Sequence, residues 1–222
     1  EIPLVVYLAS RVGPGTGIPT YNMQGDLDIA LRAGHGEFPR IVIAPGDPIE
    51  TIEITNQAFY LSEKHKALTI ILSDKHIAES EFSSTIKPQK PLKIKVNREV
   101  PGERNIIIKA TSYEHNQYGI TTENAQIAIK NANKRLEKYK KIQQACTQFP
   151  MIKTHGKKNS KNLIIAWGSP KGAIVDAIKD LDYKFLQVIY MKPLSNQIKK
   201  EMQKANKIIL IESNLTGQLG RI

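Results

Sequence analysis

Short apolar runs alternate with segments of helical periodicity along the first part of the chain. The runs are rich in Val, Ile and Leu and have the length of buried strands; they lie at residues 3–8, 41–44 and 68–73. Helices are expected at residues 24–33, 47–66 and 74–80. Asp47 followed by Pro48 is typical of a helix start, because the carboxylate caps free N–H groups and proline lacks a donor that the first turn would leave unused. The alternation predicts βαβ units and a mainly parallel sheet.

The pattern changes in the middle of the chain. Residues 83–104 are rich in proline and lysine, which is linker composition, and a brief strand is expected at residues 106–108. A long polar helix follows over about residues 122–145, with a narrow apolar stripe at helical spacing. So narrow a stripe indicates a helix that lies across the outside of another element.

The last part is predicted to form a small doubly wound α/β unit. Its strands are expected at residues 163–167, 185–190 and 208–211. Ser169 and Pro170 are expected to cap a helix that reaches about residue 181, and a further helix is expected over residues 194–205. This order of elements indicates another parallel sheet with helices on its faces.

These patterns divide the chain into three parts. They are an α/β domain at residues 1–86, a linker with the long helix at residues 87–158, and the doubly wound domain at residues 159–222. The chain starts at a strand-like run without an initiator Met and stops where a helix begins. We therefore expect it to be a piece of a longer polypeptide.

Composition and cysteine count exclude several classes of protein. No apolar run approaches the roughly 20 residues that a membrane span needs, and the first residues lack the features of a secretory signal. The single cysteine, Cys146, excludes an internal disulfide and a metal or cluster site made of this chain's thiolates alone. Cys146 is interpreted as an inert thiol. We expect a cytoplasmic protein that does not enter a membrane.

The net charge of +11 is unevenly distributed. Residues 1–86 carry 6 Lys+Arg and 11 Asp+Glu, so 26 and 10 of the chain's 32 and 21 remain for residues 87–222. A solvated lysine-rich face explains this excess, and a surface for an acidic protein partner is the alternative. Nucleic acid is disfavoured as a partner, because no binding motif accompanies the charge.

The segment after the first strand is the best candidate for chemistry. Gly13, Gly15 and Gly17 alternate with Pro and Thr at the carboxyl end of a strand, where open α/β sheets bind ligands. Arg11 enters this segment, and a guanidinium there would hold a carboxylate or phosphate through paired hydrogen bonds. An ordinary tight turn, with Arg11 paired to an acidic neighbour such as Asp26, is the alternative. The Gly-Lys-Ser/Thr ending of a phosphate-binding P-loop is absent.

A resemblance to a known family separates these two interpretations. The sequence from Arg11 to Thr20, followed by Gln24-Gly25-Asp26-Leu27, resembles the signature of α subunits of 2-oxoacid:ferredoxin oxidoreductases, particularly of the 2-oxoglutarate type. The similarity keeps its order over nearly the whole chain and continues through residues 34–40, 44–47, 72–75, 167–172 and 212–219.

The resemblance implies both a fold and an activity. Residues 1–86 would be an N-terminally incomplete thiamine-diphosphate pyrimidine-type domain, and residues 159–222 a C-terminally incomplete domain like the C-terminal domain of transketolases. The enzyme would decarboxylate a 2-oxoacid oxidatively, transfer the acyl group to coenzyme A and pass electrons to ferredoxin. Thiamine diphosphate would be shared with a β subunit, which would carry Mg²⁺ and a [4Fe–4S] cluster.

The resemblance also implies site residues. Arg11 would bind the substrate's carboxylate, and Thr16, Pro19 and Thr20 would shape the same pocket. Other residues that the family uses would lie upstream of the first residue, so the chain alone is expected to be inactive. Ser10 and Gly15 stand where the family commonly has glutamine and serine, so the resemblance favours 2-oxoglutarate without identifying the 2-oxoacid.

Further polar residues are weaker candidates. His35 and Glu37 are interpreted as packing in a turn or as the rim of an active site. Two glycine-containing loops offer capping groups or, alternatively, anion or subunit contacts; their candidate residues are Ser169, Lys171, Asn214 and Thr216. The remaining histidines lack metal-ligand spacing, so no metal site is expected on this chain.

Two other functions stay open at this point. One is the β-type subunit of a thiamine-diphosphate-dependent 2-oxoacid dehydrogenase complex, which uses lipoamide in place of ferredoxin. The other is a basic, non-enzymatic module that binds an acidic protein or nucleic acid, with the strong salt dependence of such binding.

Overall fold

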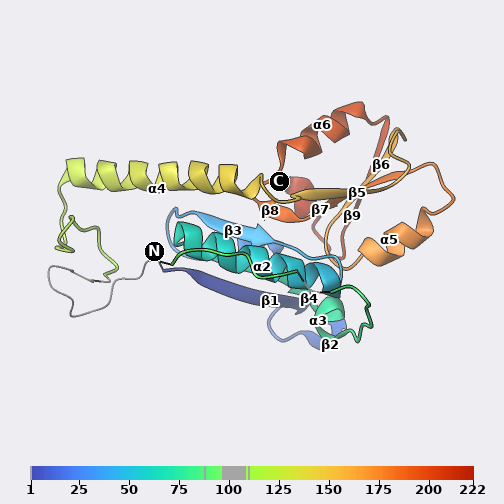
Figure 1. The fold of residues 1–222 in the computed structure, drawn as a ribbon, viewed down its shortest axis with the longest axis horizontal. Coiled ribbons are helices and arrows are strands. Elements are labelled where there is room, and N and C mark those ends of the chain that lie inside the picture. The colour runs from blue at the N-terminus through green and yellow to red at the C-terminus, as the bar shows by residue number, and fades with distance from the viewer. Residues whose placement is uncertain (1, 88, 97–108, 110) are drawn as a thin grey trace.

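A computed structural model describes residues 2–87, 89–96, 109 and 111–222 of the chain. The strand expected at residues 106–108 lies outside the described residues. The described strands form two sheets (Figure 1). Each sheet has parallel strands at its centre and an antiparallel strand at one or both edges, so the predicted α/β class is confirmed.

The first sheet has the strand order β2-β1-β4-β3-β8. Its strands are β1 (Leu4–Val12), β2 (Ile18–Asn22), β3 (Arg40–Ile43), β4 (Leu68–Asp74) and β8 (Tyr190–Lys192). β1, β4 and β3 are parallel, whereas β2 and β8 are antiparallel to their neighbours. The strands β3 and β4 are buried along nearly all of their length and carry consecutive apolar residues at 41–43 and 70–72, as expected for strands covered on both faces.

Three helices of the described chain lie between the strands β2, β3 and β4 or directly after β4: α1 (Leu27–Arg32), α2 (Pro48–His65) and α3 (Lys75–Glu79). The predicted start of α2 is confirmed, because the Asp47 side chain accepts a hydrogen bond from the Glu50 N–H at 2.7 Å and proline occupies the first turn. Asp74 caps α3 in the same way, accepting from the Ile77 N–H at 3.1 Å.

The second sheet has the order β5-β7-β6-β9. Its strands are β5 (Ile152–Gly156), β6 (Asn162–Ala166), β7 (Lys184–Val188) and β9 (Lys207–Ile211). The accompanying helices are α5 (Lys171–Ala177), α6 (Asn196–Lys204) and the short 3₁₀ helix η1 (Leu219–Arg221). The antiparallel strand β5 was not predicted, because its sequence Ile-Lys-Thr-His-Gly lacks a continuous apolar run.

The single strand predicted at residues 185–190 is wrong. β7 ends at Val188, and β8 begins at Tyr190 in the other sheet, where Tyr190 is opposite Ile43 of β3. The Ile189 carbonyl accepts a hydrogen bond from the Ala44 N–H at 2.7 Å. The chain therefore passes directly from one sheet into the other, which a run of apolar residues cannot reveal.

Two further predictions need correction. The first strand is longer than the predicted residues 3–8, because β1 extends to Val12 and pairs with β2 as an antiparallel hairpin. The predicted cap by Ser169 and the helix end near residue 181 are also wrong. No side chain caps α5, which ends at Ala177, and the Ser169 hydroxyl accepts a hydrogen bond from Asn22 instead.

One hydrophobic cluster contains residues of both sheets. Val42 and Leu72 of the first sheet pack in it with Leu163 and Leu186 of the second, and Leu27 of α1 joins them. A second cluster lies between α2 and the first sheet, and a third beneath α5. Because residues of both sheets share this cluster, the two sheets pack against each other and water is excluded from between them. The domain limits at residues 86/87 and 158/159 stay a prediction.

The long helix α4 (Ala125–Cys146) packs on the first sheet's unit near its C-terminal end, and polar contacts of Asn131 and Arg135 with residues 114 and 115 hold its middle. Ile142 and Cys146 are its buried residues and belong to the cluster between α2 and the first sheet. Ile129 is 62% exposed, and Figure 1 shows the N-terminal half of α4 projecting beyond the first sheet. The apolar stripe expected on this helix is therefore buried near its C-terminal end and exposed at Ile129 and Leu136.

Two substitutions test whether the apolar packing of α4 is concentrated near its C-terminal end. Ile142→Ala removes a fully buried side chain and is expected to lower the free energy of unfolding by about 2–5 kcal/mol. Ile129→Ala, on the same helix, is expected to change it by less than about 0.5 kcal/mol. Urea unfolding followed by circular dichroism measures both. Equal losses in the two variants would show that the outer half of α4 is also packed.

Candidate functional site

The carboxyl ends of β1, β3 and β4 lie at one edge of the first sheet. These strands are parallel, so Arg11, Asp47 and Asp74, which end or follow them, are at this edge. The β1–β2 hairpin projects from the same edge, and in Figure 1 it lies far from the N-terminal half of α4. This edge is where open α/β sheets bind ligands.

The hairpin has a backbone that depends on glycine. Gly15 and Gly17 have φ angles of 61° and 49°. A Cβ atom on Gly17 would lie 2.0 Å from the Val12 carbonyl oxygen, so no other residue fits there. Thr16, Pro19 and Thr20 are all exposed in this hairpin beside Arg11. The structure thus brings together the four residues that the resemblance assigns to substrate binding.

Arg11 is held loosely. Its guanidinium lies 3.6 Å from Glu79, and its side chain is 48% exposed. Glu79 has a shorter ion pair with Lys75, at 2.7 Å. Arg11 thus pairs with an acidic neighbour, as the alternative interpretation expected, but the partner is Glu79 and not Asp26, which accepts a hydrogen bond from the buried Ser10 hydroxyl at 2.6 Å. A long, solvated ion pair is weak, so Arg11 is available to an incoming anion.

Ser169 lies at this edge as well. Its hydroxyl accepts a hydrogen bond from the Asn22 side chain at 3.2 Å, and its N–H lies 3.4 Å from Asp74. Asn22 ends β2 and also accepts a hydrogen bond from the His76 N–H at 3.0 Å. The loop before α5 therefore supports the base of the hairpin.

Lys171 belongs to a buried ion cluster at the boundary of the two sheets. Its ammonium is hydrogen-bonded to Asp47 and lies 2.7 Å from Glu50. Glu50, which is 4% exposed, also accepts hydrogen bonds from Lys153 at 3.0 Å and Gln187 at 2.6 Å. The positive charge of Lys171 is thus matched by two carboxylates of the first sheet's unit.

The ionisation of Glu50 reflects these contacts. Burial alone would raise its pKa, but hydrogen bonds from Lys171 and Lys153 outweigh burial and hold the pKa at about 2. The pKa of Lys171 is raised, since its bonds with Asp47 and Glu50 outweigh its own burial. Both groups are charged at neutral pH and stabilise each other.

Asn214 and Thr216 lie in a loop that also joins the two units. The Asn214 side-chain oxygen accepts hydrogen bonds from the N–H groups of Thr216 and Gly217, at 3.2 and 2.8 Å. Gln218, in the same loop, accepts from the Leu27 N–H at 3.0 Å, at the start of α1. The exposed Thr216 takes part only through its backbone and a long contact with Arg221.

Gln24 is a structural residue that sequence reasoning missed. Its fully buried amide donates to the Trp167 carbonyl at 2.8 Å and accepts from the Ser213 N–H at 2.9 Å. Gln218 and Glu50 were missed too. Single polar residues within loops or one helix turn carry no periodic signal, and only the docked structure shows what they contact.

His35 and Glu37 are not near Arg11. They precede β3, so they lie at the edge of the first sheet where its parallel strands begin, opposite the hairpin. Both side chains are exposed, and Glu37 lines a cavity beside α4. Arg11 and the pair His35 and Glu37 therefore lie at opposite ends of the parallel strands.

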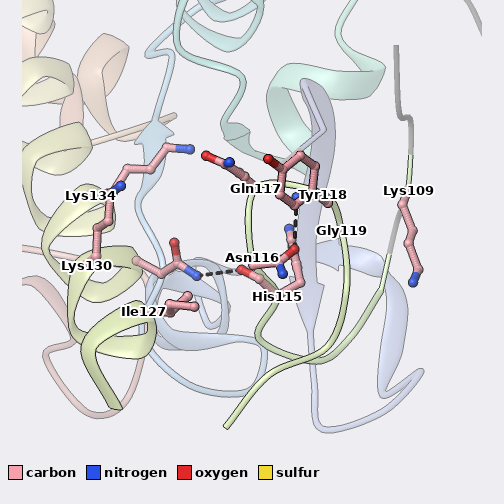
Figure 2. A pocket seen from close by; sticks show the side chains of 10 residues that line it. Lys109, His115, Asn116, Gln117, Tyr118, Gly119, Ile127, Lys130 and Lys134 are labelled. Carbon is pink, nitrogen blue, oxygen red and sulfur yellow. Dashed lines mark hydrogen bonds between the residues drawn. The ribbon is translucent and has the colours of Figure 1, made fainter. Parts of the chain in front are cut away.

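A cavity of about 690 Å³ lies between α4 and residues 115–119. Figure 2 shows Lys130 and Lys134 of α4 on one side of it, with Lys109 beyond the 115–119 segment. Asn131 donates a hydrogen bond to the His115 carbonyl at 3.0 Å and ties the two walls together. This cavity contains none of the sequence-derived site residues.

Metal-binding and membrane-spanning features were sought in the described part of the chain. There, no group of three or more His, Cys, Asp and Glu side chains is arranged to hold a metal ion. No described helix combines the length and apolar character needed to cross a membrane. Cys146 is buried, and burial raises the pKa of its thiol to about 12, which agrees with an inert thiol.

Comparisons with known proteins give consistent results. Residues 1–148 match the family described as pyruvate flavodoxin/ferredoxin oxidoreductase, thiamine diphosphate-binding. The chain is 33% identical to the 2-oxoacid:ferredoxin oxidoreductase subunit alpha of Saccharolobus solfataricus, over 100% of this chain and 40% of that protein. It is 28% identical to the 2-oxoglutarate synthase subunit KorA of Methanocaldococcus jannaschii, over 99% and 64%.

A solved structure is similar over the same length. The 2-oxoglutarate:ferredoxin oxidoreductase of Magnetococcus marinus, with 2-oxoglutarate, coenzyme A and succinyl-CoA bound, superimposes with a TM-score of 0.81 at 25% identity. The match covers 99% of this chain and 43% of that one. The chain thus spans about two fifths of the length of several of its curated relatives, with 40% of the first of them covered.

The pH dependence of stability tests the role of Glu50. Its pKa is about 2 in the folded protein against 4.5 ordinarily, so its charge stabilises the fold above about pH 4.5, and this contribution is lost as the pH falls towards 2. Glu50→Gln should therefore be destabilising at pH 6, and its deficit relative to the unsubstituted chain should shrink by on the order of 3 kcal/mol by pH 2.

Glu53→Gln, on the same helix and 3.6 Å from Lys153, is the matched control. Its deficit should stay below about 1 kcal/mol at every pH. Urea unfolding at each pH measures both variants. A Glu50→Gln deficit that is constant from pH 6 to pH 2 would contradict the lowered pKa of Glu50.

Proposed function

The chain belongs to the pyruvate flavodoxin/ferredoxin oxidoreductase family of thiamine-diphosphate-binding domains, and we propose that it acts in a 2-oxoacid:ferredoxin oxidoreductase as part of the α subunit. The reaction is the oxidative decarboxylation of a 2-oxoacid, with 2-oxoglutarate as the favoured substrate. Relatives named for 2-oxoacids and for 2-oxoglutarate support this choice. The acyl group leaves as a coenzyme A thioester, and electrons pass to ferredoxin.

The position of Arg11 is the observation that carries the proposal. Its half-exposed guanidinium lies at the ligand-binding edge of the first sheet, beside a glycine hairpin, with only a long ion pair to Glu79. A 2-oxoacid has a permanent carboxylate next to the reacting carbonyl. When Arg11 binds that carboxylate, the carbonyl carbon acquires a defined orientation. The bound substrate then loses less rotational freedom on reaching the transition state.

The rest of the hairpin defines the pocket on this chain's side. We assign Thr16, Pro19 and Thr20 to it, because all three are exposed beside Arg11 on the same hairpin. Threonine hydroxyls donate and accept hydrogen bonds, whereas Pro19 supplies an apolar wall. The glycine backbone keeps its N–H groups free of side-chain cover, so a substrate oxygen can approach them.

The cofactors divide between this chain and its partner. Thiamine diphosphate, when bound, would supply the carbanion chemistry that decarboxylation of a 2-oxoacid needs. The described residues contain no cluster that could hold the diphosphate's metal ion, and the single cysteine is buried. We therefore assign Mg²⁺ and the [4Fe–4S] cluster to a β subunit that completes the site.

The alternatives are weaker. A lipoamide-dependent dehydrogenase subunit and a non-enzymatic binding module gain no support from the relatives reported above, which are named as ferredoxin oxidoreductases and 2-oxoglutarate synthases. The basic residues of the second part also include several that are already paired within the chain, such as Lys153, Lys171 and Lys184.

The complex purified with its β subunit provides the first test. We expect it to reduce a viologen dye when 2-oxoglutarate and coenzyme A are both present, and the chain without the β subunit to be inactive. Pyruvate, assayed in parallel, reports the substrate preference. Absence of coenzyme A-dependent reduction with every 2-oxoacid would reject the proposed function.

Substitution of Arg11 tests the assigned carboxylate contact. Arg11→Met is expected to lower kcat/KM at least tenfold, because a charge-assisted hydrogen bond contributes roughly 1.5–3 kcal/mol. Arg11→Lys should retain part of the activity, because it keeps the charge but loses the paired geometry. Lys200→Met, which removes an exposed positive charge on α6, is the control. Unchanged kinetics in Arg11→Met would remove Arg11 from the substrate site.

A further inference from the structure

A cavity of about 670 Å³ lies where the first sheet begins, between the loop that leads into β3, helix α4 and strand β8. We call it the β3-edge pocket and define it by Glu37, Phe38, Arg40, Leu136, Tyr139 and Lys192, which are among its lining residues. Arg40 is the first residue of β3, so the pocket is at the sheet edge opposite the hairpin. Its volume is typical of sites for small organic ligands.

The pocket has a large excess of positive charge. Arg32, Arg40, Arg135 and Lys192 line it, whereas Glu37 is its single acidic lining residue. Arg32 is paired with Asp28 at 3.0 Å and Arg135 with Glu114 at 2.6 Å. Within the described part of the chain, no carboxylate lies within ion-pair distance of Arg40 or Lys192. Two adjacent cations are thus left without a counter-charge.

Arg40 is the more unusual of the two. Only 3% of its surface is exposed, yet within the described part of the chain its side chain donates a single hydrogen bond, to the neutral Ala30 carbonyl at 3.3 Å. Its Nε–H is buried and has no acceptor among the described residues. The guanidinium also lies over the Phe38 ring, 4.4 Å from its centroid. A buried guanidinium normally has an anionic partner, because burial of an unpaired charge is costly.

The charged form of the Lys192 side chain is disfavoured by the same surroundings. Burial, and then the charges of Arg40 and Arg32, lower the pKa of its ammonium group. An anion between Lys192 and Arg40 would remove this repulsion. A phosphate suits the position, because its oxygens can accept hydrogen bonds from a guanidinium and an ammonium at the same time.

The opposite wall of the pocket is apolar. Leu136 is 55% exposed on α4, and Tyr139 lies one turn further along the same face of the helix. Leu31 and Pro39 also line the pocket. A ligand that fits both walls has a charged end and an apolar or aromatic body.

We propose that the β3-edge pocket binds a small organic phosphate, with the phosphate between Arg40 and Lys192 and an aromatic or apolar body against Leu136 and Tyr139. This site lies at the opposite sheet edge from Arg11, and its occupancy does not depend on the proposed enzymatic function. It also gives the segment that contains His35 and Glu37 a binding role in place of a catalytic one.

Calorimetric titration of the purified chain with ADP tests the proposal. ADP carries both a phosphate end and an aromatic body, whereas adenosine and pyrophosphate each carry one of the two. We expect ADP to saturate one site, and each partial probe to bind at least tenfold more weakly. Pyrophosphate that binds as tightly as ADP would overturn the role assigned to the apolar wall.

Two variants locate the binding. Lys192→Met removes one unpaired charge, and Leu136→Asp places a carboxylate on the exposed apolar wall; each should raise the Kd for ADP at least tenfold. Both positions tolerate substitution better than the buried Arg40. Lys134→Met, in the other α4 cavity (Figure 2), should bind ADP normally. Absence of saturable ADP binding, or equal binding by the first two variants and the unsubstituted chain, would overturn the proposal.

Discussion

A buried carboxylate, Glu50, governs how the two sheets meet. It comes from the first turn of α2, but three of its hydrogen-bond donors, Lys153, Lys171 and Gln187, come from the second sheet's unit. If the two units separated, the charge of Glu50 would lose its compensation, and removal of a partner from a buried ion pair is strongly destabilising. This cluster therefore restricts the units to one relative position, which the shared apolar cluster alone would specify less sharply.

That relative position shapes the candidate substrate site. With the units docked, Ser169 reaches Asn22 at the base of the hairpin, and Gln24 reaches the Trp167 carbonyl. Both contacts immobilise the segment that follows Arg11. The hairpin is exposed, but its base is held by groups from a distant part of the sequence. A carboxylate-binding arginine needs such support, because a misplacement of about 1 Å is costly for catalysis.

Positive side chains are paired differently at the two ends of the parallel strands in the first sheet. Near the carboxyl edge, Lys171 is matched by Asp47 and Glu50, so its charge serves the structure. At the other edge, Arg40 and Lys192 share no carboxylate with the described residues around them. Lys171 has two carboxylate partners, whereas Arg40 and Lys192 have none among the described residues. This difference is the physical basis for assigning an anionic ligand to the pocket that contains Arg40 and Lys192.

The sequence by itself determined the elements whose cause is local. The apolar runs of β3 and β4, the Asp47–Pro48 start of α2 and the glycines of the hairpin could be interpreted from neighbouring residues, because strand burial, capping and positive φ act over a few positions. The motif around Arg11 also indicated a carboxylate site, through its resemblance to a family.

The tertiary structure decided everything that depends on distant partners. Residues 185–190 read as one strand, yet the chain changes sheets at Ile189, because pairing with β3 is available only once the units are docked. His35 and Arg11 are close in sequence but lie at opposite sheet edges, since one precedes a parallel strand and the other ends one. Lys153, a partner of Glu50, and Trp167, a partner of Gln24, are more than 100 residues away from them. Such contacts leave no periodic trace in a sequence.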